Sequence, residues 1–160
     1  MRMRSRDVVI AVVLASAYAA CTHVLAPISF WLINVRVANA LRCFAAIFGW
    51  PAVVGLAVGI LLANIISPLG AIDLLSPLVV GPSLAAIYLL RRKSVLAGFA
   101  VVFLTVSLWV SFMISIVAGM PFLTVFAFVA PGVFVSDVIL PYALLRAILR
   151  VMPSWDWRRR

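Results

Sequence analysis

Long apolar runs, with charged residues gathered at their ends, constrain this chain more than any other feature. Residues 8–26 contain no Lys, Arg, Asp or Glu, and a run of this length can cross a lipid bilayer. Charged residues make up 11% of the chain, whereas about a quarter of a soluble domain is charged. The runs do not alternate between apolar and polar residues, which favours helices over barrel strands. The sequence therefore predicts an all-α membrane protein with one integral-membrane domain over residues 1–160.

Proline, glycine and charged residues divide the chain into six predicted transmembrane helices. We expect the helices at residues 7–26, 35–48, 51–66, 77–90, 95–118 and 123–151. The predicted N-caps are Asp7, Ser76 and Ser94. Distortions are expected at Gly81-Pro82, Pro131-Gly132 and Pro141, because proline removes a helical hydrogen bond.

The basic residues predict the orientation of the chain in the membrane. They cluster before the first predicted helix, between the fourth and the fifth, and after the sixth. Basic clusters of this kind mark the cytoplasmic side of a membrane protein. The sequence therefore predicts a multi-pass protein of the cell membrane with both termini in the cytoplasm. The net charge of +9 is explained by these flanking clusters, so no nucleic-acid partner is predicted.

A stripe of small residues runs along the first predicted helix. Ala11, Ala15 and Ala19 recur every fourth residue, so they share one helical face. Small side chains let a second helix approach closely. Two interpretations follow and stay open here: packing inside the bundle, or docking of a separate subunit.

The chain offers few groups for chemistry. It has one histidine and no glutamate, and its two cysteines lie within apolar runs without a metal-binding spacing. Neither a nucleophile–base pair nor a nucleotide-binding motif is present. We therefore predict that the protein is not an enzyme and uses no cofactor and no metal.

Polar residues gather instead in the predicted outer half of the membrane. They are Arg36, Asn39, Arg42, Asn64, Asp73 and Asp137. An arginine as deep as Arg42 costs about 2.5 kcal/mol or more in lipid unless it faces protein or water. Convergent polar groups in an apolar setting predict a pocket for a small molecule. The alternative, compatible with a pocket, is that Arg42 and Asp137 neutralise each other.

Several motifs resemble one known family. They are Ala-Pro-Ile-Ser-Phe (26–30), Val-Arg-Val-Ala-Asn-Ala-Leu (35–41), Gly-x3-Gly-x3-Ala-Asn-x2-Ser-Pro-Leu-Gly-x2-Asp (55–73) and Leu-Pro-Tyr-Ala-Leu-Leu-Arg-Ala (140–147). Together they resemble the QueT family of queuosine-precursor transporters, which are substrate-binding S components of energy-coupling factor (ECF) transporters.

The resemblance implies a six-helix S-component bundle with a substrate pocket on the extracellular side. It implies as partners a membrane scaffold subunit and two cytoplasmic ATPases, with the scaffold docking on the face of Ala11, Ala15 and Ala19. The expected substrate contacts are Arg36, Asn39, Arg42, Asn64, Asp73 and Asp137, with aromatic stacking from Phe30 or Trp31.

Two departures from the family pattern leave the substrate open. Family members often carry glutamate where this chain has Asn39, and Gly-Glu where it has Ser136-Asp137. A carboxylate suits both the donor edge of a 7-deazaguanine base and the cation of its aminomethyl form. The alternatives are an S component for another vitamin and a structural membrane subunit without a substrate.

Overall fold

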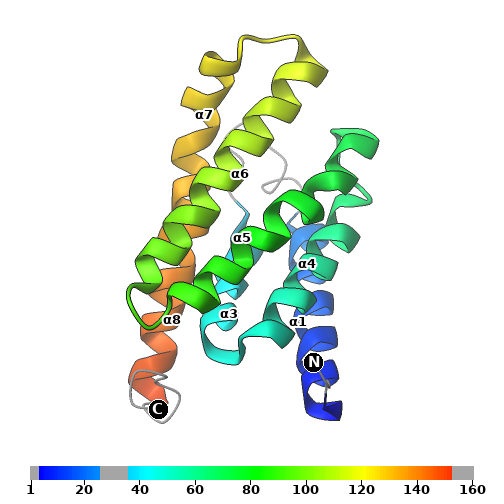
Figure 1. The fold of residues 1–160 in the computed structure, drawn as a ribbon. Helices are drawn as coiled ribbons and strands as arrows, with labels where there is room; N and C mark the ends of the chain where they lie inside the picture. Colours follow the sequence, from blue (N-terminus) through cyan, green and yellow to red (C-terminus); the bar gives the residue numbers. More distant parts are fainter. Residues whose placement is uncertain (1–3, 26–35, 153–160) are drawn as a thin grey trace.

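The computed structural model describes residues 4–25 and 36–152, and these residues form a bundle of helices (Figure 1). The elements are α1 (Ser5–Val24), η1 (Val37–Arg42), α3 (Cys43–Phe48), α4 (Trp50–Asn64), η2 (Gly70–Leu75), α5 (Ser76–Leu90), α6 (Val95–Ala118), α7 (Phe122–Phe134), η3 (Val135–Ile139) and α8 (Leu140–Val151). Consecutive elements join, so that the described residues form six helices: Ser5–Val24, Val37–Phe48, Trp50–Ile66, Gly70–Leu90, Val95–Ala118 and Phe122–Val151. The predicted all-helical fold of six helices is confirmed for this part of the chain.

Four helical segments are long and apolar enough to cross a membrane. They are Ser5–Val24, Gly70–Leu90, Val95–Ala118 and Phe122–Val151. The segments Val37–Phe48 and Trp50–Ile66 are apolar but shorter. The protein is therefore a multi-pass membrane protein, while six complete spans remain a prediction.

Two of the three predicted N-caps are wrong. The first helix begins after Arg4, whose backbone N–H donates to Asp7 Oδ2 at 3.0 Å, so Asp7 lies inside the first turn. Ser76 is already helical, because η2 leads directly into α5. Ser94 does cap α6, since its Oγ accepts from the backbone N–H of Ala97 at 3.2 Å.

The predicted second helix is made of two different turns. Residues 37–42 form the 3-10 helix η1 and residues 43–48 form α3. A 3-10 helix has three residues per turn, so Arg36, Asn39 and Arg42, spaced by three, lie close to one line along it.

Proline distorts the helices less than the sequence indicates. Pro82 lies inside α5, which continues to Leu90, so the predicted interruption at Gly81-Pro82 is wrong. Membrane helices tolerate proline where neighbouring groups compensate for the missing hydrogen bond. In the last helix the irregularity is the π-helical turn η3, which lies between Pro131 and Pro141 rather than at either residue.

The α1 and α4 helices lie side by side, and their backbones meet at small residues (Figure 1). Ala11, Ala15 and Ala19 are buried on this face of α1. A Cβ added at Gly55 would lie 2.4 Å from the Ala11 carbonyl oxygen. The alanine stripe is therefore packed inside the bundle, and docking of another subunit on it remains a prediction that requires α4 to move away.

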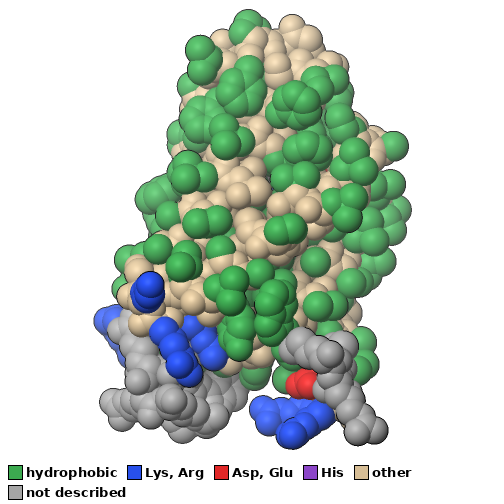
Figure 2. Space-filling model, in the orientation of Figure 1, with side chains coloured by type: hydrophobic (Ala, Val, Ile, Leu, Met, Phe, Trp, Pro, Cys, Tyr) green, Lys and Arg blue, Asp and Glu red, His purple; other side chains and the backbone are tan. Residues whose placement is uncertain are grey.

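Basic side chains gather at one end of the molecule, the lower end in Figure 2. The start of α1, the α5–α6 turn and the end of α8 all lie at this end (Figure 1). Above it, the visible face is largely apolar, as a lipid-facing surface requires. The fold thus separates a basic end from the half that holds the buried polar groups, and the assignment of the basic end to the cytoplasm stays a prediction.

Candidate functional site

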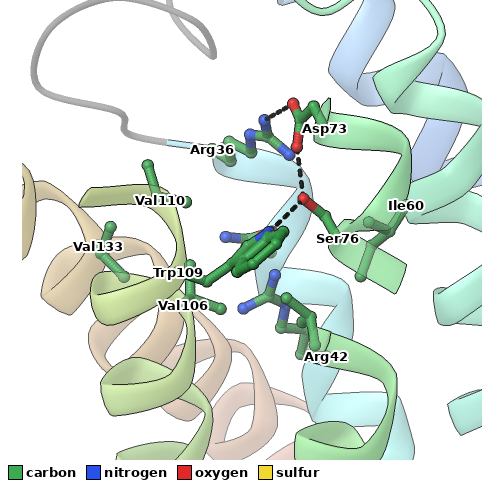
Figure 3. A pocket seen from close by; sticks show the side chains of 11 residues that line it. Arg36, Arg42, Ile60, Asp73, Ser76, Val106, Trp109, Val110 and Val133 are labelled. Atoms are coloured by element: carbon green, nitrogen blue, oxygen red, sulfur yellow. Dashed lines mark hydrogen bonds and ion pairs between the residues drawn. The ribbon is translucent and has the colours of Figure 1, made fainter. Parts of the chain in front are cut away.

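One group of polar side chains, here called the Asp73 cluster, joins η1, α4, η2, α5 and α6. Its members are Arg36, Asn64, Asp73, Ser76 and Trp109, and all of them except Asn64 are labelled in Figure 3. Asp73 Oδ1 accepts from Ser76 Oγ at 2.5 Å and from Asn64 Nδ2 at 2.9 Å. Arg36 Nη1 donates to Asn64 Oδ1 at 3.0 Å, and Arg36 Nη2 lies 3.6 Å from Asp73 Oδ2. Trp109 Nε1 donates to Ser76 Oγ at 2.8 Å.

The local sequence explains how Asp73 reaches the interior. Gly70 has a φ of +70°, which allows the chain to turn sharply into η2. Asp73 and Ser76 then lie three residues apart, one turn of 3-10 helix, so their side chains face the same way. Asp73 is 1% exposed and Asn64 is also buried, so the Asp73 carboxylate is an interior group and not a surface turn.

A second group, here called the Asp137 cluster, lies deeper and joins α1, η1 and η3. Asp137 Oδ1 lies 2.5 Å from Arg42 Nη1 and accepts from Asn39 Nδ2 at 2.6 Å. Tyr18 Oη donates to Asn39 Oδ1 at 2.7 Å. All four residues are buried. The predicted neutralisation of Arg42 by Asp137 is therefore present in the structure.

The π-helical turn η3 brings its side chains onto η1. Ser136 Oγ donates to Gly132 O at 2.9 Å and accepts from the backbone N–H of Arg36 at 3.0 Å. Asp137, the next residue, reaches Asn39 and Arg42 on the same element. Single π-helical turns are rare in proteins, and those that occur are often found at functional sites. Here the turn fixes the start of η1 and places a carboxylate beside it.

A small cavity separates the two clusters. Its volume is about 20 Å³, which is enough for one water molecule. Polar lining comes from Arg36, Asn39, Arg42, Asp73, Ser76 and Trp109, and apolar lining from Ile60, Val80, Val106, Val110 and Val133. Figure 3 shows Trp109 reaching from α6 toward Ser76, between Arg36 and Arg42.

Several buried polar atoms around the cavity have no hydrogen-bond partner among the described residues. Asp73 Oδ2 and Arg42 Nε belong to residues that line it, and Asp137 Oδ2 belongs to a residue next to the lining residues Asn39 and Arg42. Leaving such an atom unpaired costs about 1–3 kcal/mol or more. Polar atoms of this kind favour a bound polar molecule, because it would supply the missing partners.

The structure brings together all six predicted contact residues that it describes: Arg36, Asn39, Arg42, Asn64, Asp73 and Asp137. Trp31 and Phe30 lie outside the described residues. Whether the six bind a substrate remains a prediction, since the hydrogen bonds seen here are to other groups of the protein.

Sequence reasoning missed three members of the clusters. Tyr18 lies in an apolar run, and the sequence does not show whether it faces lipid or the core. In the structure it is 0% exposed, so its hydroxyl group is buried. The sequence predicts Ser76 as a helix cap, and it does not distinguish whether Trp109 faces a cavity or lipid. A buried tyrosine hydroxyl needs a hydrogen-bond partner. The position of Tyr18 in the first predicted helix was therefore the one indication that it could belong to a polar cluster.

Comparisons with known proteins give one result. No curated protein and no solved structure matches the chain. The sequence model of the QueT transporter family matches residues 8–150. This range includes every residue of the Asp73 and Asp137 clusters. Because the match covers most of the chain, the protein belongs to the QueT transporter family.

Proposed function

We propose that the protein is the substrate-binding S component of an ECF transporter and imports a queuosine precursor of the 7-deazaguanine type. The observation that carries the proposal is the cavity between two ion-paired clusters, inside a bundle of membrane helices. Charged groups within a membrane protein are costly and usually mark a substrate path. Family membership supports transport as the role of that path.

The chemistry of the cavity suits a planar base with donor and acceptor edges. Asp73 Oδ2 accepts no hydrogen bond among the described residues, so it suits the N–H groups of a guanine-like edge. Arg42 carries an unpaired N–H at Nε, which suits a ring carbonyl oxygen. Trp109 borders the same space and offers an aromatic face for stacking.

The cavity must expand before it can hold such a base, because its volume of about 20 Å³ is that of a single water site. The bond from Trp109 Nε1 to Ser76 Oγ crosses the space between α6 and α5. We propose that this bond opens when the substrate enters. The described arrangement then corresponds to a contracted site.

The energy for import would come from partner subunits, namely a membrane scaffold and two cytoplasmic ATPases. The sequence contains no nucleotide-binding motif, so a transporter of this kind needs an external source of energy. Co-expression of this chain with an ECF scaffold and its ATPases should allow uptake of the base into cells. Uptake that persists with an inactive ATPase would contradict the proposed partnership.

Two alternatives predict different observations. An S component for another vitamin would co-purify with that vitamin, which mass spectrometry of the extracted ligand identifies. A structural subunit would bind no ligand, and it explains equally well the Arg42–Asp137 pair and the small cavity. Family membership favours the transporter interpretation.

Calorimetric titration of the purified protein with 7-deazaguanine bases tests the proposal. We expect saturable binding that is weakened at least about tenfold, or about 1.4 kcal/mol, by Asp73→Asn. Asp7→Asn is the matched control, because Asp7 lies in the first turn of α1 and outside the cavity lining. The absence of binding, or equal weakening by both variants, would refute the proposed site.

A further inference from the structure

The charged groups at the cavity are already paired within the protein. Two guanidinium groups, those of Arg36 and Arg42, border it directly, whereas Asp73 is the one carboxylate in its lining among the described residues. Asp137 is not part of the lining, but it forms an ion pair with Arg42 and balances its charge. The two arginines and the two aspartates therefore leave no net negative charge to attract a ligand cation.

Both nearby carboxylates already face a guanidinium group. Asp137 Oδ1 lies 2.5 Å from Arg42 Nη1, and Asp73 Oδ2 lies 3.6 Å from Arg36 Nη2. A ligand cation would have to share one of these carboxylates with an arginine. Like charges brought together in a desolvated site repel strongly, because little water screens them.

Within residues 4–25 and 36–152, the chain has no further carboxylate at the site. It contains four acidic residues, and the other two are Asp7, in the first turn of α1, and Asp156, in the basic tail after α8. Residues 26–35 include no acidic residue and no basic residue. The balance of charge around the cavity is therefore set by the arginines and aspartates already described.

Asn39 adds no negative charge to the site. It is a neutral amide in the cavity lining, its Oδ1 accepts from Tyr18 Oη at 2.7 Å, and its Nδ2 donates to Asp137 Oδ1 at 2.6 Å. The amide oxygen is thus held by a donor inside the protein. Its amide nitrogen, a donor, cannot coordinate an ammonium group.

Building on the proposed function, we propose that the site selects an electrically neutral base and discriminates against a cationic one. Within the 7-deazaguanine class, the preferred substrate carries an uncharged group at position 7. The base with an aminomethyl group there is a cation at neutral pH, because an alkyl amine keeps its proton well above pH 7. It is the disfavoured member.

Three bases separate the effect of charge from that of size. They are the 7-cyano, 7-hydroxymethyl and 7-aminomethyl forms of 7-deazaguanine, titrated calorimetrically into the purified wild-type protein. The hydroxymethyl and aminomethyl groups are nearly equal in size and differ in charge. We expect the cyano and hydroxymethyl bases to bind at least about tenfold more tightly than the aminomethyl base.

The outcomes distinguish this inference from the function on which it rests. Equal or tighter binding of the aminomethyl base, relative to the hydroxymethyl base, would overturn the charge selection and leave the proposed transport of 7-deazaguanines in place. Binding of none of the three bases would refute both.

Removing one cation from the lining gives a second test. Arg36→Gln replaces a guanidinium group by a neutral amide and leaves the Asp73 carboxylate without this ion pair. We expect it to reduce the preference for the hydroxymethyl over the aminomethyl base by at least about threefold, with the ratio of the two affinities as the readout. The ratio is independent of how much protein is folded, and an unchanged ratio would contradict the role of charge.

Discussion

The contact between α1 and α4 makes a sharp prediction about a single methyl group. Gly55→Ala places a Cβ 2.4 Å from the Ala11 carbonyl oxygen and 2.7 Å from the Ala11 Cα. Ordinary contacts of a Cβ begin near 3.4 Å, so the helices must separate by about 1 Å at this point. The opposing atoms belong to backbone, so no side chain can rotate away to relieve the contact.

The cost follows from the packing. Overfilling a tightly packed contact destabilises a protein by about 1–3 kcal/mol, and the rigidity of the Ala11 backbone places this site in the upper part of that range. Alanine is the better helix former by about 1 kcal/mol, which offsets part of the loss. We therefore expect Gly55→Ala to lower the free energy of unfolding by about 1–2 kcal/mol.

Thermal unfolding of the purified protein in detergent measures the effect. A loss of this size corresponds to a fall in Tm of about 2–8 °C for a chain of this length. Gly81→Ala is the matched control, because a Cβ there would meet the Ala57 Cβ at 3.6 Å, an ordinary contact. We expect the Tm of the control to stay unchanged or rise.

A Tm for Gly55→Ala equal to or above that of Gly81→Ala would refute the close α1–α4 contact. In that case α4 would not cover the face of α1 that carries Ala11, and a partner subunit could dock there.

Three further predictions concern the two clusters. Arg42→Ala and Asp137→Ala should each destabilise the protein by about 3–5 kcal/mol, because each leaves a buried charge unpaired. In a thermal unfolding assay, the double variant Arg42→Met/Asp137→Leu should recover much of this loss. Strictly additive losses would argue against the ion pair. Tyr18→Phe should cost about 1–3 kcal/mol in the same assay, because it leaves Asn39 Oδ1 without its donor; an unchanged Tm would mean that this bond contributes nothing. Trp109→Ala should weaken base binding at least about tenfold, whereas Trp109→Phe should keep it within a few-fold if stacking dominates. Equal loss in both variants would argue against stacking on Trp109.

The candidate site was predictable to the extent that its residues are costly in lipid. Arg42, Asp73 and Asp137 stand in apolar surroundings, so their presence required partners inside the protein. The structure supplies those partners and brings the residues together from distant parts of the chain. The sequence did not indicate Tyr18 or Trp109 as members, because aromatic residues of membrane helices occur facing lipid, in the core and in pockets.

The distortions of the helices were harder to predict than the helices. Proline was expected to break α5 at Pro82, yet α5 is continuous, and the irregular turn of the last helix lies at Val135–Ile139. A π-helical turn contains one extra residue held by tertiary contacts, here from Ser136 to the start of η1. Local propensity carries no information about such a contact.

The amino-acid sequence by itself determined the membrane location, the helical class, the α6 helix from Val95 to Ala118 and the identity of the charged residues that must be buried. Each of these depends on hydrophobicity or on the local signal of a cap, and both act within one segment. Only the tertiary structure decided that α4 covers the alanine stripe of α1, that Tyr18 and Asn39 join the Arg42–Asp137 pair, and that Trp109 borders the cavity. These facts depend on which helix faces lie together, and that choice is made by close packing between segments far apart in the chain.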